Sequence, residues 1–170
     1  MIGTPGWLEL AKQGQLYAFG YLTEEKLNAL YLTLRALSPE TACTLYLDTE
    51  GGDNCSLPIL EAILRLNCLT VVCGKAWSWG LMFAVCGEQR LAVPAATFLY
   101  HGERDRWHPE LTARGANFMA ERTTQGFDWW MEQADSQEEL RFGTLQAVAW
   151  GVVEAAVPDW ESLATGLAKT

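Results

Sequence analysis

A serine stands in a segment whose pattern is typical of an enzymatic nucleophile. Residues 74–80 read GKAWSWG, with Ser78 between small residues two positions before and after it. Apolar runs on both sides predict a buried strand, a tight turn and a helix that begins near Ser78. Such a turn directs the hydroxyl to the strand's carboxyl end and leaves the first helical N–H groups free to hold an oxyanion. A serine that only caps the helix fits the same pattern, so both interpretations stay open.

Two further features are predicted at strand ends. Gly51 and Gly52 follow the apolar run 43–47, and His101 follows the run 98–100. The carboxyl ends of parallel strands lie along one edge of a sheet, so these residues would meet Ser78 there. Together they would supply a nucleophile, a general base and backbone donors for an oxyanion. Taken singly, the glycines also fit an ordinary turn and the histidine a structural role.

Alternating strands and helices must position these residues. Thr23 before two glutamates predicts a helix start, and apolar residues follow it at helical spacing. The continuous apolar run 69–74 is typical of a strand buried on both faces of a parallel sheet. Expected strands cover 15–19, 43–47, 69–74, 90–93 and 97–101. Expected helices cover about 24–37, 56–66, 79–86, 110–133 and 146–150, with a terminal helix after 159. This succession predicts an α/β fold with right-handed crossovers.

Composition narrows the class of protein. We expect one domain over 1–170, with a short N-terminal segment at 1–14, because 170 residues suit a single core. An apolar fraction of 49% excludes disorder, and a net charge of −9 argues against nucleic-acid or membrane partners. The most apolar stretch is far shorter than the roughly 20 residues of a bilayer span. With five cysteines, no CxxC pair and no evident secretory signal, we expect a cytoplasmic protein with reduced thiols. No clustered Cys/His spacing is present, so no zinc site is expected. We also expect no cofactor and no other metal.

The order and spacing of several segments resemble the proteolytic subunit of the Clp peptidase (ClpP), within the crotonase-like fold. The resemblance covers about 15–157 and is carried by 45–52 (LYLDTEGG), 74–80, 92–101 and 147–153 (AVAWGVV). It implies repeated strand–helix units and a long handle-type helix, here 110–133, through which two rings dock.

The resemblance also implies a role for each candidate residue. Ser78 would be the nucleophile and His101 its general base. The backbone N–H groups of Gly52 and Trp79 would form the oxyanion hole. The chain order Ser…His differs from the order Ser…acid…His of the α/β-hydrolases, which weighs against that rival fold.

The third triad member is where the sequence departs from the family. The family has an aspartate shortly before its Ala-Val-x-aromatic-Gly segment. Counting back without gaps places Glu139 there, whereas alignment through 141–142 places Leu140 there. We expect Glu139 to be the acid, with Asp135 or a Ser–His dyad without an acid as open alternatives. A solvated acidic helix face would equally explain Glu139.

Two other regions bear on substrate and assembly. The loop 103–107 is highly charged, where the family has an apolar, glycine-rich strand lining the substrate groove. The chain holds eight tryptophans, a heavy aromatic load for an acidic protein of this size. We expect Trp129 and Trp130, on the predicted helix 110–133, to be buried at an oligomer interface. Packing within the core is the alternative.

The sequence therefore predicts a ClpP-like serine endopeptidase. It would cleave peptides or unfolded proteins inside a homo-oligomeric ring, with an AAA+ unfoldase as a candidate partner. Alternatives are an ATPase-independent, phage-type protease and a catalytically silent, ring-forming scaffold. A crotonase-like acyl-CoA enzyme would share the fold and the oxyanion hole without needing the Ser78–His101 pair.

Overall fold

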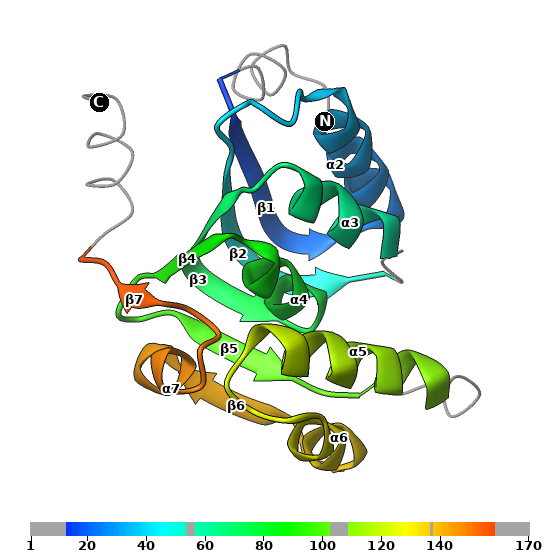
Figure 1. The fold of residues 1–170 in the computed structure, drawn as a ribbon, viewed down its shortest axis with the longest axis vertical. Helices are drawn as coiled ribbons and strands as arrows, with labels where there is room; N and C mark the ends of the chain where they lie inside the picture. Colours follow the sequence, from blue (N-terminus) through cyan, green and yellow to red (C-terminus); the bar gives the residue numbers. More distant parts are fainter. Residues whose placement is uncertain (1–12, 54–56, 103–108, 137, 159–170) are drawn as a thin grey trace.

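The computed structural model describes residues 13–53, 57–102, 109–136 and 138–158. These residues form a mixed α/β fold around a seven-stranded, mainly parallel sheet of order β1-β2-β3-β4-β7, with β5 between β3 and β6 (Figure 1). The strands are β1 (Gln15–Leu22), β2 (Thr44–Gly52), β3 (Leu69–Trp77), β4 (Gln89–Ala92), β5 (Thr97–Tyr100), β6 (Leu140–Gly143) and β7 (Ala155–Ala156). The helices are α2 (Glu24–Ala36), α3 (Leu57–Arg65), α4 (Trp79–Cys86), α5 (Pro109–Arg122), α6 (Phe127–Asp135) and α7 (Thr144–Ala149). The predicted α/β class is confirmed.

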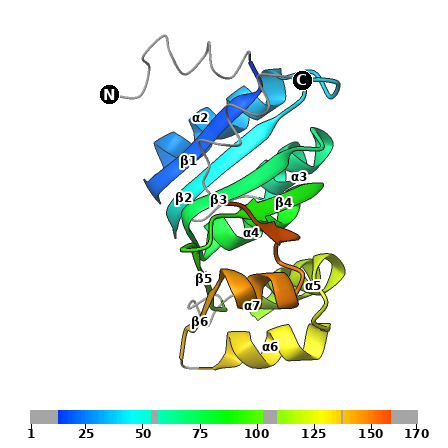
Figure 2. The ribbon, with the colours of Figure 1, turned by 90° about the vertical axis from the view of Figure 1, so that its left-hand side faces the viewer.

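Strand β3 organises the sheet because its two halves have different neighbours. Its first half, 69–72, pairs with β4, and its last three residues, 75–77, pair with β5. β5 in turn pairs with β6, in antiparallel register. Figures 1 and 2 show α2, α3 and α4 against the main sheet, and α5, α6 and α7 around β5 and β6. The carboxyl ends of β2, β3 and β5 therefore meet at one edge.

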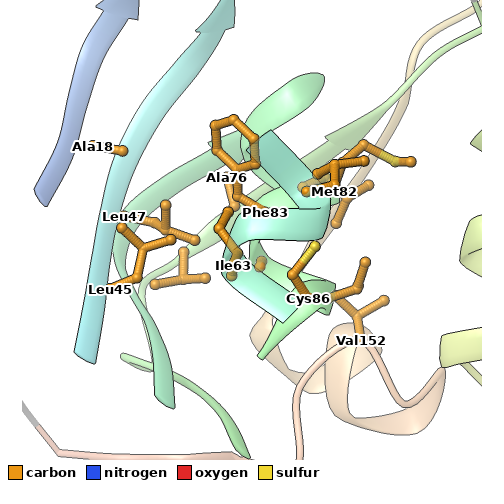
Figure 3. Packing of buried hydrophobic residues seen from close by; sticks show 14 of the residues in the cluster. Ala18, Leu45, Leu47, Ile63, Ala76, Met82, Phe83, Cys86 and Val152 are labelled. Atoms are coloured by element: carbon orange, nitrogen blue, oxygen red, sulfur yellow. The ribbon is translucent and has the colours of Figure 1, made fainter. Parts of the chain in front are cut away.

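Helix α4 lies at the centre of the hydrophobic core. All residues from Gly80 to Cys86 are buried, as expected for a helix that is apolar on every side. Figure 3 shows Phe83 and Ile63 packed toward Leu45 and Leu47 of β2. This burial fixes the position of the helix, and so of the serine that precedes it.

Strands β2 and β3 extend further than their apolar runs predict. Residues 48–52 lie beyond the strand expected over 43–47, yet they continue β2 alongside β1 and reach β3 through the Thr49–Ala76 pair. Register shifts accompany this polar half, and Gly51 has a left-handed φ of 85°. The ladder to two neighbouring strands holds the segment extended although its composition is turn-like.

The expected long helix over 110–133 is two helices, α5 and α6. The residues between them include two threonines and Gly126, whose extended backbone (φ −76°, ψ 170°) starts α6. Thr124 donates its backbone N–H to the carbonyl of Trp150 at 2.8 Å, instead of to the preceding helical turn. This tertiary hydrogen bond and the glycine end the first helix and redirect the chain.

Trp130 is a core residue of the single chain, so its predicted placement at an oligomer interface is wrong. The side chain is 0% exposed, and its Nε1 donates to Thr123 Oγ1 at 3.0 Å. Its ring packs edge-on against Tyr100 of β5, with centroids 4.8 Å apart. Trp129 is half-buried and contacts both Trp130 and Trp150. These aromatic contacts join α6 to β5 and to the end of α7.

Three predictions lie outside the described residues: the terminal helix after 159, most of the N-terminal segment 1–14, and the charged loop 103–107. No helix in the described ranges is long and apolar enough to cross a bilayer.

Candidate active site

Ser78 occupies the junction between β3 and α4 in a strained backbone conformation. Its φ of 54° and ψ of −120° fall outside the regions that residues with a Cβ normally adopt. A nucleophile held on a sharp strand-to-helix turn has this kind of strain. The Ser78 side chain makes no capping hydrogen bond to α4, so the helix-cap interpretation does not explain the residue.

Glycines allow β2 to approach this turn closely. A Cβ added to Gly51 would lie 2.8 Å from Ser78 Cβ and 2.9 Å from the Trp77 carbonyl oxygen. A Cβ added to Gly80, in the first turn of α4, would lie 2.5 Å from Thr49 Cγ2. Both distances are shorter than real contacts allow, so larger residues would push β2 away from the serine.

Thr49 supports the glycine turn from inside the protein. Its side chain is 0% exposed, and its hydroxyl donates to the Gly20 carbonyl at 2.6 Å. The same oxygen accepts the backbone N–H of Gly51 at 3.1 Å. Sequence reasoning did not single out Thr49, because the burial of its hydroxyl becomes visible only in the structure.

The predicted oxyanion donors, Gly52 and Trp79, have different surroundings. Trp79 is the first residue of α4, so its N–H is one of those that have no acceptor within the helix. Gly52 packs against the backbone of Leu22 in β1, and Gly51 is the glycine that directly contacts Ser78. The Gly51 N–H is used by Thr49. The oxyanion role of Gly52 and Trp79 stays a prediction.

His101 follows β5 at the same edge of the sheet. Trp77 pairs with Leu99, and the Ser78 N–H donates to the Leu99 carbonyl at 2.9 Å, which brings the two strand ends together. The His101 ring is half-buried, with Nδ1 2.6 Å from the carbonyl oxygen of Gly102. Within the described ranges, no hydrogen bond joins the Ser78 hydroxyl to the imidazole. Catalytic hydrogen bonds are often long without substrate and tighten when it binds.

Glu139 lies just before β6, whose first residue, Leu140, pairs with Tyr100, the residue before His101. Its carboxylate forms an ion pair with Arg141, with Oε2 2.6 Å from Nη2. The Arg141 guanidinium in turn lies over the Trp77 ring, 4.8 Å from its centroid. Glu139 is therefore close to the histidine along the backbone, and its carboxylate is engaged by a cation.

Asp135, the alternative acid, is the last residue of α6 and is exposed. The pKa of the Tyr100 phenol is raised, first by burial and then by the negative charge of Asp135. Asp135 is thus electrostatically coupled to the residue before His101. As with Glu139, its role as the triad acid stays a prediction.

A charged and aromatic cluster borders the site. Lys75 forms an ion pair with Glu50 at 2.6 Å, and its ammonium lies 4.8 Å from the Trp77 ring centroid. Trp77 Nε1 donates to Thr97 Oγ1 at 3.0 Å, which fixes the indole against β5. These contacts involve the residue immediately before Ser78 and therefore help to hold the turn.

The described residues contain no group of three or more His, Cys, Asp or Glu side chains that could hold a metal ion. A polar cavity of about 360 Å³ lies at the other end of α4, near Cys86, Arg90 and Arg122. None of the candidate catalytic residues lines it.

Comparison with known proteins identifies the fold of the chain. No protein-family model matches the sequence. The structure is similar to that of a mutant of ClpP1 from Listeria monocytogenes, with a TM-score of 0.74 and 16% sequence identity. The match covers 91% of this chain and 97% of that one. The chain therefore has a ClpP-like fold.

Proposed function

We propose that the chain is a ClpP-like serine endopeptidase. The observation that carries the proposal is the conformation of Ser78: a strained serine on a strand-to-helix turn, without a capping hydrogen bond. Backbone strain of about 1–3 kcal/mol persists where the surrounding structure imposes it, and it gathers at active sites. A serine that served only as a helix cap would not need this strain.

In the proposed reaction, Ser78 Oγ attacks the carbonyl carbon of a peptide bond while His101 Nε2 accepts the hydroxyl proton. The N–H groups of Trp79 and Gly52 stabilise the tetrahedral oxyanion. His101 then gives the proton to the leaving amine, and an acyl-enzyme remains. Water, deprotonated by His101, hydrolyses the ester and regenerates Ser78. Glu139, Asp135 and a dyad without an acid all remain candidates for the third position.

The substrate class is a peptide or an unfolded protein, and the proposed assembly is a homo-oligomeric ring with an AAA+ unfoldase as a candidate partner. The resemblance to ClpP supports the substrate class, the ring and the unfoldase partner. In the described part of the chain, apolar side chains remain for an interface to cover, such as Leu145, which is 88% exposed. Sedimentation velocity tests the assembly, and a monomer at micromolar concentration would contradict the ring.

A fluorophosphonate probe tests the chemistry. We expect one adduct on Ser78, located by mass spectrometry. It should be absent in Ser78→Ala and strongly reduced in His101→Ala. Ser38→Ala, an exposed serine in the loop after α2, is the matched control and should label like the wild type. Fluorogenic peptides then show whether the labelled serine supports turnover. A folded assembly that never labels would refute the peptidase.

A catalytically silent scaffold is the second candidate. It is favoured by one observation: in the described residues, no hydrogen bond joins Ser78 and His101. In that case Ser78 would not label, whereas the ring would still form. The crotonase-like acyl-CoA enzyme would instead show thermal stabilisation by an acyl-CoA without labelling.

A further inference from the structure

The imidazole of His101 has a backbone acceptor where a catalytic triad has a carboxylate. Nδ1 lies 2.6 Å from the carbonyl oxygen of Gly102. A carbonyl oxygen can only accept a hydrogen bond, so Nδ1 must carry the proton. The neutral ring then keeps its lone pair on Nε2, the nitrogen that a general base uses. We infer that the Gly102 carbonyl, rather than a side-chain acid, sets the tautomer and orientation of His101. This inference rests on the proposed function.

The position of this carbonyl is set by packing against α6. Gly102 is buried, and a Cβ on it would lie 2.6 Å from the Ala134 carbonyl oxygen and 3.1 Å from Ala134 Cβ. Any other residue would therefore force the chain away from α6. Tyr100, two residues earlier, is fixed by its edge-on contact with the fully buried Trp130. The backbone of His101 is therefore fixed on both sides, by Tyr100 before it and by Gly102 after it.

The nearby carboxylates have other interactions. Glu139 Oε2 is 2.6 Å from Arg141 Nη2, so leaving this guanidinium for His101 would break a charge-assisted hydrogen bond. Arg141 is itself stacked over Trp77, beside the serine turn. Asp135 is exposed at the end of α6, where water screens its charge. Glu139 is accordingly assigned to the Arg141–Trp77 contact, and Gly102 is the positioning residue for His101.

Nitrogen-15 NMR of histidine tests the inference directly, without substrate. The chain has only two histidines, so His108→Gln leaves His101 as the single signal. In the neutral ring we expect the proton on Nδ1 and a bare Nε2, unchanged in Glu139→Gln and in Asp135→Asn. A proton on Nε2, or a tautomer that changes in either variant, would overturn the inference.

Acylation by the fluorophosphonate gives a second readout. Loss of a triad acid that sets the tautomer lowers the rate by about 10⁴-fold. We expect Glu139→Gln and Asp135→Asn to stay within about threefold of the wild type. A loss of a hundredfold or more in either variant would sink the inference and leave the peptidase intact. If no variant labels, the proposed function fails, and the tautomer alone decides the assignment of Gly102.

Discussion

The strain at Ser78 makes a stability prediction that needs no substrate. Ser78→Ala and Ser78→Gly both remove the hydroxyl, but only glycine is relaxed at φ 54° and ψ −120°. Relief of strain at such a position is worth about 1–3 kcal/mol. The greater freedom of glycine in the unfolded chain opposes this by about 0.5–1 kcal/mol. We therefore expect Ser78→Gly to be more stable than Ser78→Ala by about 1 kcal/mol.

Urea unfolding followed by circular dichroism measures this difference. For a protein of 170 residues, 1 kcal/mol corresponds to about 2–4 °C in Tm. Ser136 provides the matched control, because it lies at φ −59° and ψ 137°, where any residue fits. There the order should reverse, with the glycine variant less stable than the alanine variant by about 0.5–1 kcal/mol. Equal stabilities at Ser78, or a more stable alanine variant, would refute the strain argument and with it the main support for the nucleophile.

Three further perturbations test the surroundings of the turn. Gly51→Ala should destabilise the protein by about 1–3 kcal/mol in urea unfolding, because its new Cβ would lie 2.8 Å from that of Ser78. Gly126→Ala, with open space around it, should change stability by less than about 1 kcal/mol; equal losses would contradict the steric reason. Thr49→Val removes two hydrogen bonds of a buried hydroxyl and should cost about 1–3 kcal/mol, whereas Thr49→Ser should recover most of it. Burial raises the pKa of the Cys73 thiol from its ordinary 9 to about 11, so the unfolded thiol ionises first as the pH rises. The wild type should then lose more unfolding free energy than Cys73→Ser between pH 8 and 11, and parallel losses would exclude the shift.

The sequence predicts the elements near the serine because their signals are local. Apolar runs mark β3 and α4, and the small residues around Ser78 mark the turn between them. Placing His101 at the same edge needs only the rule that parallel strands end together. The pairing of Trp77 with Leu99 agrees with that placement.

The incorrect predictions concern features that depend on interactions between distant residues. Nothing in 48–52 predicts a strand; the segment is extended because β1 and β3 lie on either side of it. The break between α5 and α6 depends on a hydrogen bond from Thr124 to Trp150, 26 residues away. An aromatic pair such as 129–130 has the same composition in a core and in an interface, so only burial within the chain separates the two.

The third member of the proposed catalytic group shows a different limit of prediction from the sequence. Carboxylates can be found in a sequence, and a search for the partner of His101 therefore turns to Glu139 and Asp135. A backbone carbonyl is present at every residue and carries no such signal.

What the sequence does contain is Gly102, and the structure gives the reason for a glycine there: its Cα lies so close to the Ala134 carbonyl that no side chain fits. The Gly102 oxygen then lies 2.6 Å from Nδ1. A carbonyl supplies a dipole instead of a full charge, so it can fix the tautomer but stabilises the imidazolium less than a carboxylate would. If Ser78 and His101 act as proposed, we expect a slower acylation than in a complete triad, with a rate that does not depend on either acid.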